Sequence, residues 1–377
     1  LLYWSTYMLT YSLLLLTSLS YSTPSYDALV DPTNDAAYST IKNAVSDAPT
    51  NSEQPYIIKV AAGDYYEKII INKDNIQLHG EGAEKTRLYF DAYSGQPVPD
   101  KYLSEYPEIA LQSRETWGTS LSATLIVREL NFHAQDITIE NTFDFPNNDK
   151  LAKDDPNKKK HSQAVALMLD DGSDKALFKR VSLKGYQDTL FADAGRSAFI
   201  DSSIAGHVDF IFGAGMSLFF QSAIHTKDRP NKSGTIGYIT APSTNINQDV
   251  GFVFLDSRLT KDKGVPPNSV GLGRPWHPTT TFSDGRYGDP DAIGHALFIN
   301  TWMDDHIQKH PWHNMGAWAK DGTRMTYMGS DARFFEFQSS GPGAHQSTSR
   351  RQLNEVQMAR FNSIEKILGD WDPVNDN

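Results

Sequence analysis

The sequence predicts an all-β protein built as a parallel β-helix, a coil of short strands in which each turn stacks on the previous one. Five segments alternate apolar with polar residues, which is a strand pattern: KRVSL (179–183), IDSSI (200–204), FQSAI (220–224), LDSRL (255–259) and INTWM (299–303). Their last residues are 21, 20, 35 and 44 positions apart, as expected of stacked turns with loop insertions in the later ones. A β-sandwich would favour spacings of about 8–12 residues and tight hairpin turns, which do not dominate here.

A helix is expected at each end of the coil. Residues 37–49 (AYSTIKNAVSDAP) place Ile41, Ala44 and Val45 on one face, which suits a cap over the open end. Residues 350–368 are expected to form one amphipathic helix against the flank of the coil, with five apolar residues at helical spacing: Leu353, Val356, Phe361, Ile364 and Leu368. The polar stretches 91–117, 147–161, 261–268 and 278–291 read as loop insertions, and KKKH (158–161) as a solvated loop face.

The N-terminus differs in composition from the rest of the chain. Residues 1–22 include a short leucine-rich run followed by small and polar residues, which resembles the apolar core of a secretory signal. The run is too short for a comfortable membrane span, so no stable membrane insertion is expected. The basic residues that usually precede such a core are missing, and a buried segment or an interfacial anchor stays open as an alternative. The prediction is a secreted protein with a single β-helix domain over residues 23–377.

Composition excludes several classes of function. The net charge of −11 disfavours nucleic-acid binding, which normally leaves a basic footprint. The chain has no cysteine, which rules out disulfides, thiolate catalysis and cysteine-ligated zinc. No G-x-S-x-G motif is present, and GEGAEK, GAGMSL and GLGRPW lack the third glycine of a dinucleotide fingerprint.

No metal site is predicted. His306, His310 and His313 lie close in sequence, but Pro311 breaks any helix that would align them, so a surface or loop cluster is expected. The sequon at Asn231 is compatible with secretion and is weak evidence by itself.

Two aspartates in apolar surroundings are the main candidates for chemistry. Asp188 lies five residues after Leu183, and Asp209 lies five residues after Ile204. If one turn is 21 residues long here, the two carboxyl groups stack on neighbouring strands about 4.8 Å apart. Carboxyls that close titrate together, and one is pushed toward the protonated state beside its ionised neighbour. This arrangement suits a general acid beside a nucleophile or base. A structural ladder of aspartates is the alternative.

Four further side chains could complete such a site. Gln187 precedes Asp188, and Gln163 lies about one coil earlier; their amides could stabilise an oxyanion. Arg274 could fork onto a carboxylate, and Trp276 offers a flat face for a sugar ring. Each of these residues taken alone could be a packing residue. Arg229 competes with Arg274 on spacing, because it lies five residues after Ile224.

These motifs resemble those of one family of enzymes. QAVAL (163–167), GYQDTLF (185–191), VDFIFG (208–213) and LGRPW (272–276) occur in the order seen in pectin methylesterases. The stretches 37–45 and 57–71 extend the resemblance, which covers roughly residues 28–315. It implies a right-handed parallel β-helix that hydrolyses methyl esters of galacturonosyl carboxylates in pectin, without a metal or an organic cofactor. The lysine-rich stretch 147–161 has no clear counterpart.

The resemblance also implies roles for the catalytic candidates. Asp209 would be the nucleophile that attacks the ester carbonyl and carries the covalent intermediate. Asp188 would protonate the departing methanol and then activate water. Gln187 with Gln163 would form the oxyanion hole, and Arg274 would orient Asp209 and keep it anionic.

Substrate-binding residues are expected around this pair. Trp276 would contact the polysaccharide, and Tyr186 and Phe210 are weaker candidates for the same groove. Met303 is a further candidate for the lining near the ester methyl group. His207 stands where small residues are common, so it either touches the substrate or fills space.

The predicted partner is therefore pectin, or homogalacturonan, acted on by a monomeric secreted enzyme. Two alternatives stay open. One is another pectinolytic β-helix enzyme: a polygalacturonase, whose inverting carboxyls lie about 6.5–9.5 Å apart, or a lyase, for which an acidic calcium cluster would be expected. The other is a non-catalytic carbohydrate-binding relative, which would not need Asp188 and Asp209.

Overall fold

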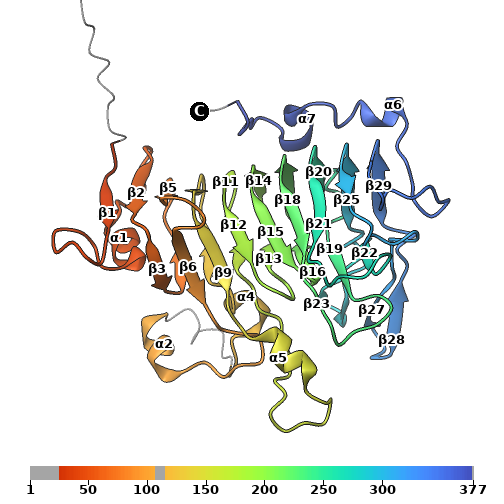
Figure 1. Cartoon of the computed structure of the whole chain (residues 1–377), viewed down its shortest axis with the longest axis horizontal. Helices are drawn as coiled ribbons and strands as arrows, with labels where there is room; N and C mark the ends of the chain where they lie inside the picture. The colour runs from red at the N-terminus through yellow and green to blue at the C-terminus, as the bar shows by residue number, and fades with distance from the viewer. Residues whose placement is uncertain (1–24, 107–114, 376–377) are drawn as a thin grey trace, which may run out of the picture.

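The computed structural model describes residues 25–106 and 115–375, and it is a parallel β-helix of three sheets (Figure 1). The predicted hydrophobic N-terminal segment, 1–22, lies outside the described residues. Every pairing within the three large sheets is parallel, and each strand except those at the ends of a sheet pairs with strands of the preceding and following turns. The predicted fold class is therefore confirmed.

The three sheets run the length of the coil, and we call them sheets A, B and C. Sheet A contains β1 (Ala28–Val30), β2 (Tyr56–Val60), β5 (Ile76–His79), β8 (His133–Gln135), β11 (Ala176–Lys179), β14 (Arg196–Ile200), β17 (Met216–Phe220), β20 (Phe252–Leu255), β25 (His295–Ile299) and β29 (Arg333–Phe337). Sheet B contains β3 (Gly63–Tyr66), β6 (Thr86–Phe90), β9 (Thr138–Asn141), β12 (Ser182–Lys184), β15 (Ser203–Gly206), β18 (Ala223–Thr226), β21 (Arg258–Lys261) and β26 (Trp302–Met303). Sheet C contains β4 (Ile69–Ile71), β7 (Leu125–Val127), β10 (Leu167–Leu169), β13 (Leu190–Ala192), β16 (Val208–Gly213), β19 (Gly237–Pro242) and β22 (Val270–Gly273).

The predicted repeat matches the register of sheet B. The last residues of the five repeat segments pair in one column, in the order Leu183, Ile204, Ile224, Leu259 and Met303. All five are buried in the central core. Like residues also stack inside sheet A, where Phe178, Phe199, Phe219, Phe254 and Phe298 form a column with ring centroids 4.4–5.1 Å apart. Similar apolar side chains at equivalent positions of successive turns thus keep the strands in register.

The corners between sheets A and B explain the polar residues within the repeat. One residue per turn adopts a left-handed backbone there, with φ between 48° and 55°: Asp136, Arg180, Asp201, Gln221, Asp256 and Asn300. Asp and Asn tolerate this conformation better than most residues with a side chain. The strand pattern therefore breaks at a fixed place in each turn.

The N-terminal helix is confirmed, although it is shorter than predicted. Helix α1 (Ile41–Asp47) begins after Thr40, whose side chain accepts a hydrogen bond from the backbone N–H of Asn43. The predicted face is buried, with Ile41, Ala44 and Val45 in contact with the core.

The prediction of one long C-terminal helix is wrong. The segment forms two short helices, α6 (Glu355–Met358) and α7 (Ile364–Leu368), because Asn354 and Ser363 each cap a new helix start. Val356, expected on the buried face, is 83% exposed. The segment still covers sheet A as expected (Figure 1), and it buries Met358, Ile367 and Leu368 against the outer apolar residues of that sheet.

The connections between the strands of the coil carry the remaining elements. These are α2 (Asp100–Glu105), α4 (Gly118–Leu121), α5 (Phe145–Lys150) and two antiparallel hairpins, β23 (Thr279–Phe282) with β24 (Gly285–Gly288) and β27 (Met315–Trp318) with β28 (Arg324–Tyr327). In the lysine-rich loop Lys159 and Lys160 are exposed, but Lys158 is not simply solvated. Its ammonium group donates to the backbone carbonyls of Asn148 and Leu151, near the end of α5. No helix within residues 25–106 and 115–375 is long and apolar enough to span a membrane.

Candidate active site

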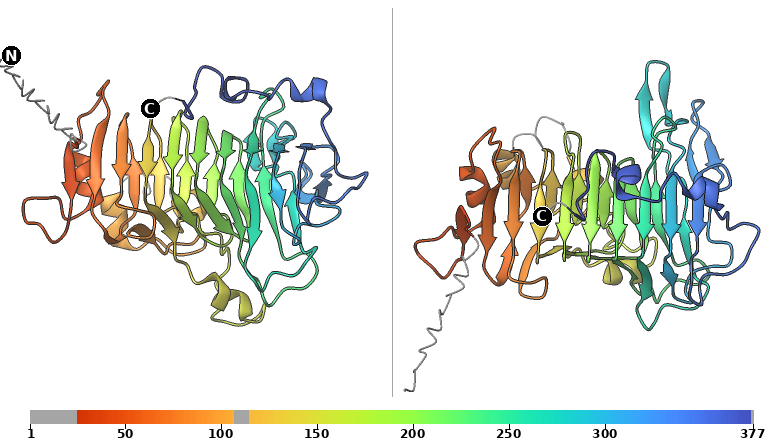
Figure 2. Two further views of the ribbon diagram at one scale, coloured as in Figure 1. Left: turned by 45° about the horizontal axis from the view of Figure 1, so that its top comes forward. Right: turned by 90° about the horizontal axis from the view of Figure 1, so that it is seen from above.

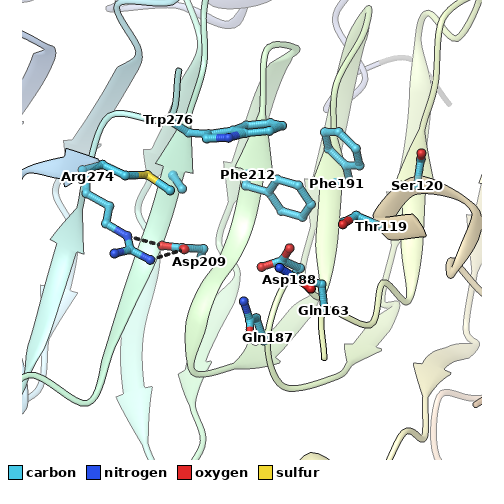
Figure 3. A pocket seen from close by; sticks show the side chains of 12 residues that line it. Thr119, Ser120, Gln163, Gln187, Asp188, Phe191, Asp209, Phe212, Arg274 and Trp276 are labelled. Carbon is cyan, nitrogen blue, oxygen red and sulfur yellow. Dashed lines mark hydrogen bonds and ion pairs between the residues drawn. The ribbon is translucent and has the colours of Figure 1, made fainter. Parts of the chain in front are cut away.

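A cleft with a volume of about 360 Å³ opens on the outer face of sheet C (Figure 3). It brings together five of the predicted catalytic residues and one predicted sugar-binding residue with six others. Its lining consists of Thr119, Ser120, Gln163, Gln187, Asp188, Phe191, Asp209, Phe212, Ala241, Arg274, Trp276 and Met315. Strands β13, β16 and β19 form its floor, and the segments before β10 and after β22 form its sides.

The two aspartates occupy equivalent positions on successive turns, as the 21-residue interval predicts. Gln187 forms a bridge with Val208, and Leu190 pairs with Ile211, so Asp188 is in register with Asp209. Both aspartates have left-handed backbones, with φ of 65° and 49°, at the point of each turn where the chain bends from sheet B into sheet C. Their exposed fractions are only 8% and 6%. The turn thus directs two carboxyls into one cleft and away from bulk water.

Arg274 distinguishes the two carboxyls. Its Nε donates to Asp209 Oδ1 at 2.9 Å and its Nη2 to Oδ2 at 2.5 Å, a two-pronged contact that matches a carboxylate (Figure 3). The guanidinium also lies over the ring of Tyr238, with its carbon 4.1 Å from the ring centroid. The rival residue, Arg229, instead pairs with Asp149 at 2.9 and 3.0 Å and does not line the cleft.

The environment of Asp188 favours its protonated form. Burial raises the pKa of Asp188 well above its usual 3.8, and the nearby charge of Asp209 raises it further. The positive charge of Arg274 and a hydrogen bond with Gln187 act in the opposite direction and are outweighed. For Arg274, burial lowers the pKa, but hydrogen bonding to Asp209 and the negative charges of Asp209 and Asp188 together outweigh it, and the net shift is upward. The cleft therefore holds a carboxyl whose protonated form is favoured beside a carboxyl that is paired with a permanent cation.

The two glutamines lie on neighbouring turns beside the carboxyls. The backbone N–H of Ala164 donates to the carbonyl of Gln187 at 3.2 Å, and this contact links the segments that carry the two amides. The side-chain oxygen of Gln163 is buried without a hydrogen-bond partner among the described residues. Both glutamines line the same cleft as Asp188 and Asp209.

An aromatic floor completes the cleft. Phe191 and Phe212 stack with ring centroids 4.2 Å apart, and Trp276 lies edge-on to them at 5.8 and 5.5 Å. Sequence reasoning missed both phenylalanines, although each follows its aspartate by three positions in YQDTLF and HVDFIF. This shared D-x-x-F spacing was the available signal. Thr119, Ser120, Ala241 and Met315 come from segments without such a signal.

Two predicted substrate-binding residues point into the protein interior, and those predictions are wrong. Phe210 is fully buried in the central core, because the left-handed backbone at Asp209 turns the next side chain inward. Met303 is also fully buried, since β26 belongs to sheet B and places it on Leu259 in the interior.

Tyr186 and His207 form a separate cluster outside the cleft lining. Tyr186 stacks on Phe145 at 6.1 Å and carries the ammonium group of Lys227 over its ring at 4.1 Å. His207 is 1% exposed and packs against Phe145 at 4.5 Å, so it fills space. Burial lowers the pKa of His207 to about 3, so it is neutral near pH 7.

The three clustered histidines do not converge. His306 is fully buried, contrary to the surface position expected for it, while His310 is exposed and hydrogen-bonds to Ser349 at 2.8 Å. His313 bonds to Gln308 at 2.6 Å. Within residues 25–106 and 115–375, no group of three His, Cys, Asp or Glu residues is arranged to hold a metal ion.

Comparisons with known proteins identify the family of the chain and agree with its fold. The Pectinesterase family model matches residues 27–98 and 108–363. Pectinesterase A of Dickeya dadantii (strain 3937) is 42% identical over 354 residues, which cover 93% of this chain and 92% of that protein. The structure of pectin methylesterase PemA from Erwinia chrysanthemi superposes with a TM-score of 0.86 at 42% identity, over 93% of this chain and 99% of that one. A pectin methylesterase in complex with a hexasaccharide also matches with a TM-score of 0.86, at 41% identity over 94% and 100% of the two chains. The chain therefore belongs to the pectinesterase family of carboxylic ester hydrolases.

Proposed function

We propose that this enzyme hydrolyses the methyl esters of galacturonosyl units in pectin and releases methanol, with Asp209 as the nucleophile and Asp188 as the acid and base. The observation that carries the proposal is the asymmetry of the stacked carboxyls. Arg274 forks onto Asp209, while burial raises the pKa of Asp188. An ionised carboxylate and a carboxylic acid within one cleft are the two groups that this ester hydrolysis needs.

In the first half of the reaction, an Asp209 oxygen attacks the ester carbonyl carbon. The bond between this carbon and the methoxy oxygen then breaks, and Asp188 gives its proton to that oxygen, so that methanol leaves. The galacturonosyl acyl group stays on Asp209 as a covalent anhydride. Asp188 is now a carboxylate and can accept a proton from water. The water attacks the acyl carbon, which releases the free galacturonate and regenerates both aspartates.

The amides of Gln163 and Gln187 support the charged intermediates of both halves. Each attack places a negative charge on the carbonyl oxygen, and a neutral amide N–H can stabilise it without competing with Asp209 for Arg274. Both side chains line the same cleft as the two aspartates. Loss of one such donor typically lowers kcat by about 10²–10³-fold.

The aromatic floor supports a polysaccharide as the substrate. Phe191, Phe212 and Trp276 present apolar ring surfaces on which pyranose rings can pack. The solved relatives include a pectin methylesterase in complex with a hexasaccharide. A cell-wall polymer as substrate also fits secretion, and the proposal includes an extracellular enzyme that acts as a monomer.

Methanol release from methyl-esterified pectin tests the proposal. The wild type should release methanol without shortening the polymer or creating unsaturated ends. Asp209→Asn should lower kcat by at least about 10⁴-fold, because an amide cannot replace the nucleophile. Asp201→Asn is the matched control, since Asp201 has a similar left-handed backbone but lies exposed outside the cleft. Chain shortening or unsaturated ends without methanol would refute the function, and full activity of Asp209→Asn would refute the nucleophile.

A further inference from the structure

Two hairpins stand beside the C-terminal end of the cleft and are joined to each other. Figure 2 shows β23–β24 and β27–β28 projecting from the same side of the coil. Strands β24 and β27 pack together, and Ala317 lies close against Gly288. The hydroxyl of Tyr327 donates to the carbonyl of Gly288 at 3.2 Å. The two hairpins thus form one unit, which we call the hairpin wall (residues 279–288 and 315–327).

A stacked pair of rings joins the hairpin wall to the site. The His277 imidazole lies flat on the Tyr327 ring, with centroids 3.3 Å apart and planes 5° apart. His277 Nδ1 also donates to the backbone carbonyl of Asp289 at 2.5 Å. His277 is 6% exposed, so the contact is sheltered from water. Burial lowers the pKa of His277, which keeps the imidazole neutral near pH 7.

Both partners of this stack are next to cleft residues. His277 directly follows Trp276, and Tyr327 pairs across the hairpin with Met315. Trp276 and Met315 both line the cleft, beside Arg274 and Asp209. Directly opposed residues in an antiparallel pair have Cβ atoms about 4.5–5.5 Å apart, so a shift of Tyr327 would move Met315 as well.

We propose that Tyr327 and His277 are positioning residues, which clamp the hairpin wall so that Met315 and Trp276 stand at fixed places across the cleft. This inference rests on the proposed function and assigns it a determinant of substrate binding. Neither ring lines the cleft itself, so the pair acts through its neighbours. Because Asp209, Asp188 and Arg274 are held by the coil, loss of the clamp weakens polysaccharide binding more than it slows the chemical step.

Steady-state kinetics of methanol release from methylated pectin test this. Tyr327→Ala should raise KM about tenfold and change kcat by less than about threefold, the pattern of lost binding without lost transition-state contacts. Tyr327→Phe keeps the stack and loses only the hydroxyl, so its KM should stay within about twofold of the wild type. Tyr287→Ala is the matched control, because Tyr287 is a hairpin aromatic that stacks on Phe282 and lies outside the cleft lining.

A double-mutant cycle separates positioning from general stability. If Tyr327 acts through Met315, then Tyr327→Ala combined with Met315→Ala should raise KM by clearly less than the product of the two single effects. Should Tyr327→Ala fail to fold, Tyr327→Leu replaces it in the cycle, with the same sign expected. An unchanged KM in a folded Tyr327 variant, a fall in kcat alone, or multiplicative effects in the cycle would overturn the inference. None of these results touches the proposed function, which fails only if the wild type releases no methanol.

Discussion

The turn that carries Asp188 and the turn that carries Asp209 have nearly the same local construction. Each leaves sheet B, bends at an aspartate with a left-handed backbone, enters sheet C and places a phenylalanine three positions later on the cleft floor. Yet burial raises the pKa of Asp188, while Asp209 forms an ion pair with Arg274. The difference arises outside both turns, because Arg274 follows β22, two strands further along sheet C.

The repeated turn brings the two carboxyls together, and a residue from a third turn, Arg274, makes their surroundings different. Two identical carboxyls one strand spacing apart would share protons without a fixed assignment of acid and base. One guanidinium with two hydrogen bonds to Asp209 gives that carboxyl a cationic partner, while burial raises the pKa of Asp188. Substitutions at these positions therefore have different expected effects, although the two turns are equivalent in register.

After Asp209→Asn, replacing Asp188 should have the largest effect on catalysis. Asp188→Asn removes the group that we propose protonates methanol and activates water, and we expect kcat to fall by about 10³-fold. The asparagine tolerates the left-handed backbone, so the fold should persist. Initial rates of methanol release, with thermal unfolding as the folding check, measure this. A loss of less than about tenfold in kcat would mean that another group supplies the proton.

Replacing Arg274 should have the next largest effect on kcat. Arg274→Ala leaves two buried carboxyls without a cation, and we expect kcat to fall by about 10²-fold or more. Arg274→Lys restores the positive charge but cannot donate two parallel hydrogen bonds to the Asp209 carboxyl, so it should recover only part of the activity. The kcat for methanol release by the two variants, measured at saturating pectin and compared with the wild type, tests this prediction. Equal activity of Arg274→Ala and the wild type would remove Arg274 from the mechanism.

The raised pKa of Asp188 also predicts how stability depends on pH. Between its ordinary pKa of 3.8 and the higher folded value, the folded protein retains a proton that the unfolded chain has released. The contribution of Asp188 to stability is therefore full at low pH and is lost as pH rises through the folded pKa. An asparagine side chain does not titrate, so the Tm of Asp188→Asn relative to the wild type should increase by roughly 2 °C or more from pH 4 to pH 8. A difference in Tm that is constant with pH would contradict this.

The smallest effect on catalysis is expected from replacing Arg229, which lies one turn after Asp209 in the coil. Arg229 pairs with Asp149, and the side chains are only 16% and 15% exposed. Arg229→Ala should destabilise the protein by about 1–2 kcal/mol and leave kcat within about twofold. Denaturant unfolding together with methanol release distinguishes this from Arg274→Ala. A large loss of kcat would mean that Arg229 reaches the site after all.

Much of the fold could be predicted because the turns of a β-helix repeat similar residues at regular intervals along the sequence. The column from Leu183 to Met303 and the stacking of Asp188 on Asp209 both follow from intervals between residues. The prediction failed where the backbone leaves the regular strand. At Asp209 the left-handed φ of 49° shifts the alternation, so Phe210 faces the core and Phe212 faces the cleft.

Two other failures have equally local causes. The apolar periodicity of 350–368 predicts one helix, but the side chains of Asn354 and Ser363 accept hydrogen bonds from nearby backbone N–H groups and start two helices. Met303 shares the repeat pattern but ends a strand of sheet B, whereas the cleft lies on sheet C. The alternation of apolar and polar residues alone does not show to which of the three sheets a segment belongs.

By itself the sequence determined the coil, its 21-residue register and the proximity of two carboxyls, because equal intervals on parallel strands place equal positions side by side. Only the tertiary structure decided which carboxyl pairs with Arg274. Arg274 lies 65 positions after Asp209, and its rival Arg229 has the same offset within its own turn that Asp209 has. The bidentate contact depends on where β22 ends relative to β16, and that is a property of the packed sheet.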